Sequence, residues 1–303
     1  MRRFLFTLFF LLLASCKNGA LELSPNKKKI QFLFQNAVGL NLQSAGCSIL
    51  DLGGAARMCQ RVEQEEPDLF FQVGPSFSHL IPKSGWTPEQ VLGARKALVE
   101  IWNLAGVSFY SVDSLDLSQG LRDFQQFSEQ KNFRLLSTNL RDKSGKAPFE
   151  PFLNVKWGKT EFRFLSFTAP QPFSPGSDWQ ALPFKESLAD LAPTVKDQAP
   201  ANWIVLGSLS AAQRKEIAAL IAGPAFFIGG SLEEENTTAW EPMGPNSFWG
   251  KAADLGRGMG KIEWNSAPTG GSKSMFTSKG LRKDLDAGNQ CSKIVNELFG
   301  SSQ

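Results

Sequence analysis

The chain has 303 residues, of which 42% are apolar and 20% are charged, enough for one large domain or two small ones with a sizeable core. Its formal net charge is +3, and no clustered basic face of the kind that binds nucleic acid is evident. We therefore expect no nucleic-acid partner. The chain contains one histidine, His79, which restricts every mechanism that depends on imidazole.

The first residues have the pattern of a secretory signal. Arg2 and Arg3 precede an apolar run, Phe4–Leu13, that is too short to span a bilayer as a mature helix. Small residues then lead to Cys16, and the four residues ending there resemble a bacterial lipobox. We predict a signal peptide over 1–15 and acylation of Cys16, palmitate included. The alternative is an ordinary signal peptide with a chance cysteine.

The segment after Cys16 is polar, and we predict a lipidated tether over 16–28 that reaches about 40 Å when extended. Lys17 rather than Asp in second place favours the outer membrane, with the periplasmic or surface face left open. Two or three acyl chains hold a protein stably at a membrane. For Lys27–Lys29 we favour a solvated charge run over contact with anionic headgroups. Without Arg2 and Arg3 the chain has 30 basic and 29 acidic residues, a net charge of +1.

Three further cysteines, Cys47, Cys59 and Cys291, leave the disulfide pattern open. An exported protein occupies an oxidising compartment, so one pair is compatible with a disulfide and one cysteine is left over. Burial of all three as small apolar residues is an equal alternative.

The first half of the chain alternates apolar runs with helical patterns. Thr87 is a good N-cap because Pro88 follows at the first helical position and Gln90 stands three residues on. Such alternation predicts helices packed on a largely parallel sheet. We predict strands over 30–36, 68–73, 107–112 and 133–139, and helices over 53–65, 87–105 and 121–132.

The second half is more varied. A hairpin is predicted around Gly158-Lys159, with strands over 149–157 and 160–168. Beyond it we predict helices over 184–196 and 210–222, strands over 203–206 and 225–228, and two or three short strands within 240–264. The composition of 265–278 is that of a flexible segment, and one or two helices are predicted within 275–299. The predicted organisation is one domain over 29–265 followed by a linker and C-terminal helices over 266–303.

Several short segments, taken in order and spacing, resemble the 5′-nucleotidase branch of the calcineurin-like metallophosphoesterases. The resemblance implies a two-sheet α/β sandwich in four layers, αββα, with a short C-terminal helical appendage. The chain has no room for that family's separate nucleoside-binding domain. The matching segments are Ile30–Asn36, Gly53–Arg57, Asp68–Gly74, Asn103–Gly106, Leu136–Asn139, Phe167–Pro170, Ile204–Leu206, Phe227–Gly230, Gly250–Lys251, Leu255–Arg257 and Gly260–Ile262.

The same resemblance implies a site in which two metal ions bind a phosphate and activate a water molecule. Its ligands and its catalytic histidine would stand at strand ends, and every matching position is substituted. Ala37 and Gly39 replace Asp-x-His, Pro75 replaces the bridging Asp, and Ser114 and Leu115 replace Asn-His. Ser208 replaces a further His, while Ser231 and Glu233 replace the two of Gly-His-x-His.

Other chemistries lack residues as well. Asp113, Asp116 and Glu233 are candidates for a hard cation, but solvated loop carboxylates are the better interpretation because no further oxygen ligands gather with them. His79 is most simply a loop histidine. A Ser-His-Asp triad has no other base available, and Gly207-Ser208 lacks the Gly-x-Ser-x-Gly pattern.

We therefore expect an exported bacterial lipoprotein with a degenerate 5′-nucleotidase-like domain, without metal or other cofactor and without catalysis. Its role would be to bind a ligand or a protein partner in the cell envelope, or to serve as a subunit of an envelope machine. The alternative is a phosphoesterase or nucleotide hydrolase with an altered metal site. Trp240, Phe248 and Trp249 follow the last degenerate motif, and core packing is favoured over recognition for them.

Overall fold

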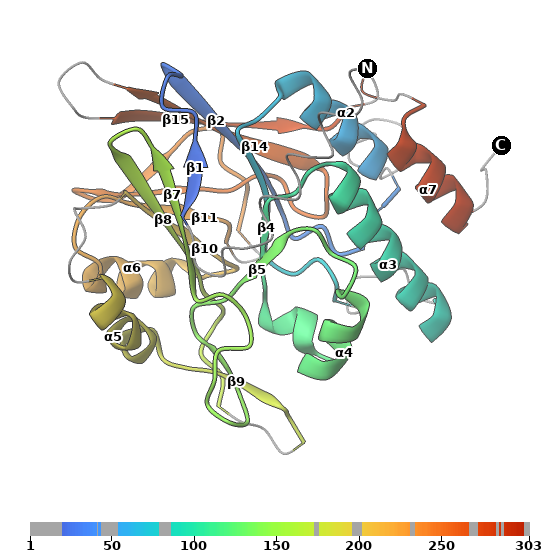
Figure 1. Cartoon of the computed structure of the whole chain (residues 1–303), viewed down its shortest axis with the longest axis horizontal. Coiled ribbons are helices and arrows are strands. Elements are labelled where there is room, and N and C mark those ends of the chain that lie inside the picture. Colours follow the sequence, from blue (N-terminus) through green and yellow to red (C-terminus); the bar gives the residue numbers. More distant parts are fainter. Residues whose placement is uncertain are drawn as a thin grey trace.

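The computed structural model describes residues 20–40, 42–43, 54–78, 86–172, 176–195, 202–230, 234–266, 272–282, 285 and 288–299. Two large mixed sheets pack face to face, and helices cover the outer face of each (Figure 1). The predicted four-layer αββα sandwich is confirmed.

The six-stranded sheet has the order β15-β14-β2-β3-β4-β5. Its parallel part consists of β2 (Lys29–Asn36), β3 (Leu69–Val73), β4 (Phe109–Ser111) and β5 (Arg134–Leu136). The strands β14 (Gly258–Ser266) and β15 (Ser272–Gly280) extend it in antiparallel fashion. Its outer face is covered by α2 (Ala55–Glu65), α3 (Pro88–Leu104), α4 (Leu121–Phe127) and α7 (Gln290–Phe299). The predicted cap of α3 is confirmed, since Thr87 and Gln90 form a capping box.

The seven-stranded sheet has the order β1-β7-β8-β10-β11-β13-β12. Its strands are β1 (Leu21–Leu23), β7 (Phe152–Trp157), β8 (Thr160–Ser166), β10 (Asn202–Leu206), β11 (Ala225–Ile228), β12 (Glu241–Gly244) and β13 (Ser247–Gly250). The predicted hairpin around Gly158-Lys159 is β7–β8. Two helices, α5 (Phe184–Val195) and α6 (Ala211–Leu220), cover the outer face. A small two-stranded sheet joins β6 (Leu140–Asp142) to β9 (Trp179–Ala181).

Aromatic side chains fill the space between the two sheets. The ring of Phe71 stacks on that of Phe109 at 4.8 Å between centroids, and Phe164 of the other sheet packs edge-on against both. All three are completely buried, and each such side chain contributes roughly 1.5–3 kcal/mol through removal from water. Trp240 and Phe248 pack against this core, and Trp249 is buried under the outer helices, so the core-packing interpretation of these residues is confirmed.

The N-terminal segment departs from the predicted tether. Within 16–28, β1 pairs in parallel with β7 and so belongs to the sheet. Lys27 and Lys29 are not simply solvated, because they form ion pairs with Asp68 and Glu263. Composition missed β1 because a three-residue edge strand between polar segments carries almost no hydrophobic signal.

The C-terminal segment also differs from the prediction. Residues 272–280 form β15, a full strand of the sheet, where a linker and the start of a helix were predicted. An edge strand buries little of itself, and β15 contributes Phe276 to the core while Met275 remains 51% exposed. Because few of its residues are buried, the composition of β15 is as polar as that of a flexible segment. The helix that follows, α7, packs against α2 and α3.

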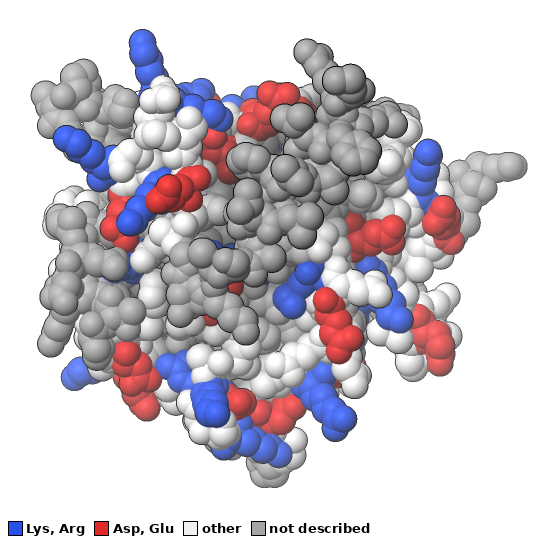
Figure 2. Space-filling model, in the orientation of Figure 1, with Lys and Arg blue, Asp and Glu red and all other residues white. Residues whose placement is uncertain are grey.

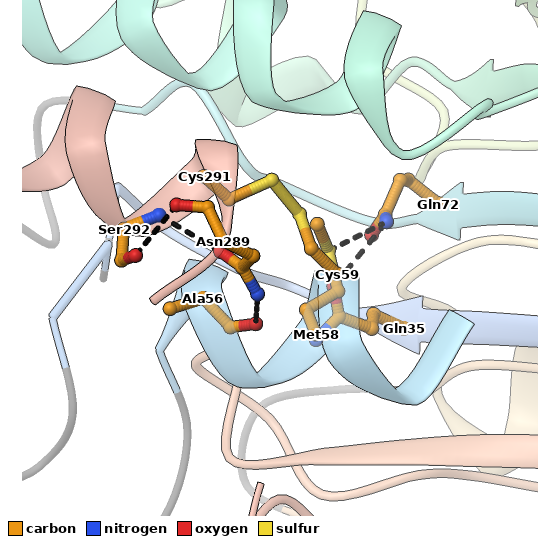
Figure 3. The surroundings of a disulfide bond; sticks show 8 residues. All are labelled: Gln35, Ala56, Met58, Cys59, Gln72, Asn289, Cys291 and Ser292. Carbon is orange, nitrogen blue, oxygen red and sulfur yellow. Dashed lines mark hydrogen bonds between the residues drawn. A yellow bond between two sulfur atoms is a disulfide. The ribbon is translucent and has the colours of Figure 1, made fainter. Parts of the chain in front are cut away.

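A disulfide joins these distant parts of the chain. Cys59 of α2 is bonded to Cys291 of α7, 232 residues away, with 6.5 Å between their Cα atoms (Figure 3). Beside it, the side chain of Asn289 donates to the carbonyl of Ala56 and accepts from the amide of Ser292. These contacts fix the start of α7 on α2. Cys47 lies outside the described residues.

The surface shown in Figure 2 carries Lys and Arg side chains intermingled with Asp and Glu. Within the described part of the chain, no helix is both long enough and apolar enough to cross a bilayer.

Candidate site at the strand ends

The loops that follow β2, β3 and β10 meet at one edge of the sandwich. The amide of Ala37 donates to the carbonyl of Val73 at 2.7 Å, which places the residue after β2 beside the end of β3. A Cβ added to Gly74 would lie 2.7 Å from the Oγ of Ser208 and 3.9 Å from the Cβ of Ala37. The structure thus brings together the predicted positions Ala37 and Ser208. Pro75 belongs to the same group because its neighbour Gly74 lies between them.

The end of β11 belongs to the same cluster of loops. A Cβ added to Gly229 would lie 2.7 Å from the carbonyl oxygen of Gly207 and 2.9 Å from the Cγ1 of Val73. The predicted positions Ser231 and Glu233 come shortly afterwards but lie outside the described residues, as do His79 and Cys16.

Asp113 connects the loop after β4 to this cluster. It is 4% exposed, and its carboxylate accepts hydrogen bonds from the amide of Leu115 at 3.0 Å and from the hydroxyl of Ser114 at 3.4 Å, with the side chain of Ser208 beside it. The amide of the next residue, Ser114, donates to the Oγ1 of Thr168 at 3.1 Å, which ties the loop to the other sheet. Burial raises the pKa of Asp113, and these hydrogen bonds act in the opposite direction.

Asp116 closes the same loop, in the short 3₁₀ helix Ser114–Leu117. One carboxylate oxygen accepts from the amides of Ser76 and Phe77 at 2.9 and 2.8 Å. The other accepts from the amide of Asp113 at 3.0 Å and from the hydroxyl of Tyr110. Burial and the neighbouring Asp113 raise the pKa of Asp116 to about 7, although the hydrogen bonds it accepts act in the opposite direction.

The expectation that Asp113 and Asp116 are solvated loop carboxylates is wrong, since both are buried. Asp116 accepts hydrogen bonds from the loop after β3 and from its own loop, so its carboxylate holds the two together. Two of the four partners of Asp116 are backbone amides from a distant part of the chain, which leave no pattern in the sequence. Both residues are therefore structural supports of this region.

The remaining predicted positions surround these carboxylates. Gly39 and Pro75 are buried, while Ser114, Leu115 and Ser208 are half-buried. Ala37 has a φ of +41°, which a residue with a side chain adopts rarely, and its side chain offers no donor atom.

The described residues at the strand ends do not fit a two-metal centre. The side chains of Ala37 and Pro75 have no ligand atom, and the side chain of Ser208 lies beside the carboxylate of Asp113. Both oxygens of Asp116 are already acceptors of strong hydrogen bonds. Across the part of the chain that the structure describes, no group of three or more His, Cys, Asp or Glu side chains is arranged to hold a metal ion.

A buried charged cluster beside these loops was missed by the sequence analysis. Arg214 of α6 donates to both carboxylate oxygens of Glu234 at 2.7 and 2.8 Å, and its guanidinium lies 4.1 Å from the ring centre of Trp249. Lys251, which is fully buried, donates to the carbonyl of Glu234 and pairs with Asp254 at 2.6 Å. Burial raises the pKa of Asp254, against the effect of Lys251. The only signal in the sequence is a lysine directly after the apolar run of β13.

No family model and no curated protein sequence matches this chain. Solved structures do. The 5′-nucleotidase precursor of Thermus thermophilus matches over 89% of this chain and 58% of its own, with 15% identity and a TM-score of 0.69. The sulfate thiohydrolase SoxB of Thermus thermophilus matches over 91% and 61%, with 13% identity and a TM-score of 0.71. The calcineurin-like phosphoesterase YfkN of Bacillus subtilis matches over 89% and 96%, with 13% identity and a TM-score of 0.62.

These likenesses establish the fold. The chain has the α/β sandwich of the metallophosphoesterases, in the form found in 5′-nucleotidases, and the resemblance seen in the sequence is confirmed at this level. The chain spans about three fifths of the length of the first two structures. At these identities the comparisons establish no activity.

Proposed function

We propose that this protein is an exported lipoprotein whose metallophosphoesterase-fold domain has no catalytic activity and serves to bind a ligand or a partner in the cell envelope. The observation that carries the proposal is the use made of the polar groups at the strand ends. At three positions where the family would place metal ligands, Ala37, Gly39 and Pro75 have no side-chain donor atom, and the buried carboxylates of Asp113 and Asp116 accept internal hydrogen bonds.

The chemistry of phosphate-ester hydrolysis explains why these substitutions matter. In this family, two metal ions stabilise the attacking and leaving oxygens and lower the pKa of the attacking water. Histidine is the usual side chain for both ligation and proton transfer, and the whole chain contains one. Recruiting Asp113 or Asp116 to a metal would break hydrogen bonds that hold the loops together. These hydrogen bonds therefore favour a structural role for both carboxylates.

Two features support export and anchoring. Cys16 stands at the end of the lipobox-like sequence, and the Cys59–Cys291 bond is of a kind that persists in oxidising compartments. Labelling with a palmitate analogue should mark the wild type and leave Cys16→Ser unlabelled. Equal labelling of the two would contradict the proposed anchor.

The decisive test is metal analysis of the folded chain combined with turnover of a generic phosphate ester. We expect less than stoichiometric zinc, manganese and iron, and a rate of p-nitrophenyl phosphate hydrolysis that is the same with and without chelator. The matched control is Asp116→Asn, which would abolish a genuine metal-dependent rate if this carboxylate served an altered site. Stoichiometric metal, or turnover that chelator removes, would instead establish a phosphoesterase with an altered metal site.

A further inference from the structure

A cavity of about 420 Å³ lies on the helix-covered side of the six-stranded sheet. The described residues that line it are Arg61, Ser278, Lys279, Gly280 and Arg282. Three of these five are cationic, and none is acidic. Such a lining attracts anions.

The fold explains why these cations converge. Lys279 of β15 stands opposite Met259 of β14, and directly opposed residues project from the same face of a sheet. Met259 is buried among the residues beneath the outer helices, so Lys279 lies on the helix-covered face, where α2 carries Arg61. The cavity is therefore formed at the corner between α2 and the sheet edge.

Arg282 is placed by the turn that follows β15. The amide of Leu281 donates to the carbonyl of Arg257 at 2.9 Å, and the side chain of Leu281 is fully buried. This anchor holds the next residue, Arg282, at the rim of the cavity while its own side chain remains exposed.

Within the described part of the chain, the positive charge at this corner is not fully compensated. Arg61 pairs there with Glu65 at 3.4 Å, and the same carboxylate also binds Lys261 at 3.1 Å. Among the described residues, no acidic side chain pairs with Lys279 or Arg282. Glu65 is thus shared between two cations, and two further cations have no counter-charge within the described structure.

We propose that this cavity binds the phosphate group of a phosphorylated molecule. Two guanidinium groups supply the forked donors that match phosphate oxygens, and Lys279 adds a compact charge. The volume exceeds that of one phosphate ion and leaves room for an organic group on the bound molecule. None of the residues that line the cavity belongs to the strand-end positions described above, so this proposal can be tested independently of the absence of catalysis.

The test uses the full chain in zwitterionic nanodiscs, titrated with inorganic pyrophosphate by isothermal titration calorimetry. The double variant Lys279→Gln/Arg282→Gln should bind at least about tenfold more weakly than the wild type, and Arg61→Gln should also bind more weakly. The matched control, Lys185→Gln/Lys215→Gln, removes the same charge from exposed positions on α5 and α6 and should change the affinity less than about twofold.

Competition then identifies the source of the phosphate. Glucose 6-phosphate is a soluble monoester, and glycerophosphoglycerol is the diester headgroup of an anionic lipid. Stronger competition by the first supports a soluble phosphorylated ligand, and stronger competition by the second supports a lipid headgroup. Absence of pyrophosphate binding by the wild type, or equal loss of affinity in the control variant, would overturn the proposal. A thermal melt of each variant separates lost binding from lost folding.

Discussion

The strand-end loops and the cationic cavity differ in whether their charged side chains are buried or exposed. In the loops, the carboxylate of Asp116 accepts four hydrogen bonds and is 1% exposed. At the cavity, Lys279 and Arg282 have no acidic partner within the described structure, and both are exposed. The carboxylate of Asp116 is part of the internal support of the molecule, whereas the side chains of Lys279 and Arg282 are exposed at the edge of the sheet.

The two regions also differ in what holds them together. The loops are joined by hydrogen bonds between buried groups, and the single hydroxyl proton of Tyr110 lies within reach of both Asp116 and the carbonyl of Gly74. The helix beside the cavity, α2, is instead bonded covalently to α7 through Cys59. Substitutions in the two regions should therefore have separable effects.

The largest expected effect on stability comes from the disulfide. The double variant Cys59→Ala/Cys291→Ala should lose about 2–5 kcal/mol of unfolding free energy, because the bond closes a loop of most of the domain and restricts the unfolded chain. Denaturant unfolding with and without reductant measures it. Reductant should lower the stability of the wild type and leave the variant unchanged; a wild type indifferent to reductant throughout unfolding would contradict the bond.

A smaller loss is expected from Asp116→Asn, about 1–3 kcal/mol. In asparagine, an NH2 group takes the place of the carboxylate oxygen that faces the backbone amide of Asp113. An NH2 group cannot accept a hydrogen bond, so this buried donor loses its partner. Glu216→Gln, at an exposed position of α6, is the control and should stay within about 0.5 kcal/mol of the wild type. Equal stability of Asp116→Asn and the wild type would remove the structural role assigned to Asp116.

The same variant has a pH signature. The pKa of Asp116 is raised from 3.8 to about 7 in the folded state, so the folded protein binds the proton more tightly than the unfolded chain. Unfolding free energy should therefore fall as the pH rises from about 4 to 7, by at most about 1.4 kcal/mol per pH unit from this group. Asp116→Asn should reduce this slope, and the raised pKa of Asp113 should leave part of it.

The smallest stability effect is expected from Lys279→Gln/Arg282→Gln, within about 0.5 kcal/mol of the wild type, because these side chains are exposed and have no acidic partner to lose within the described structure. The same melts that accompany the binding experiment give this value. A large destabilisation would show that the two charges serve the fold, which would remove the contrast with the strand-end loops.

Much of this fold was readable from the sequence where local chemistry decides structure. Apolar runs located β2, β3 and β10, and the Thr87 capping box located the start of α3. What escaped depended on distant partners. Both β1 and β15 are edge strands with little apolar content, and the Cys59–Cys291 pair spans 232 residues.

The candidate site was predicted in part. The order of motifs along the chain indicated which positions belong to the strand ends, and the structure brings Ala37, Ser208 and the loop of Ser114 together. The burial of Asp116 was not predictable, because its donors include backbone amides some 40 residues earlier. The cavity at the sheet edge was not predicted because β15, which supplies part of its lining, has too little apolar content to be recognised as a strand.

The pairing of β1 with β7 changes what an anchor at Cys16 would do. A tether reaching to Lys28 would let the domain rotate freely above a membrane. Because Leu21 is already fixed in the sheet, five Cα-to-Cα steps separate it from Cys16, and they span at most about 17 Å. With Cys16 acylated as proposed, the edge of the molecule that carries β1 is confined near the bilayer. The anchor then acts as an orientation restraint that limits which faces a partner can approach.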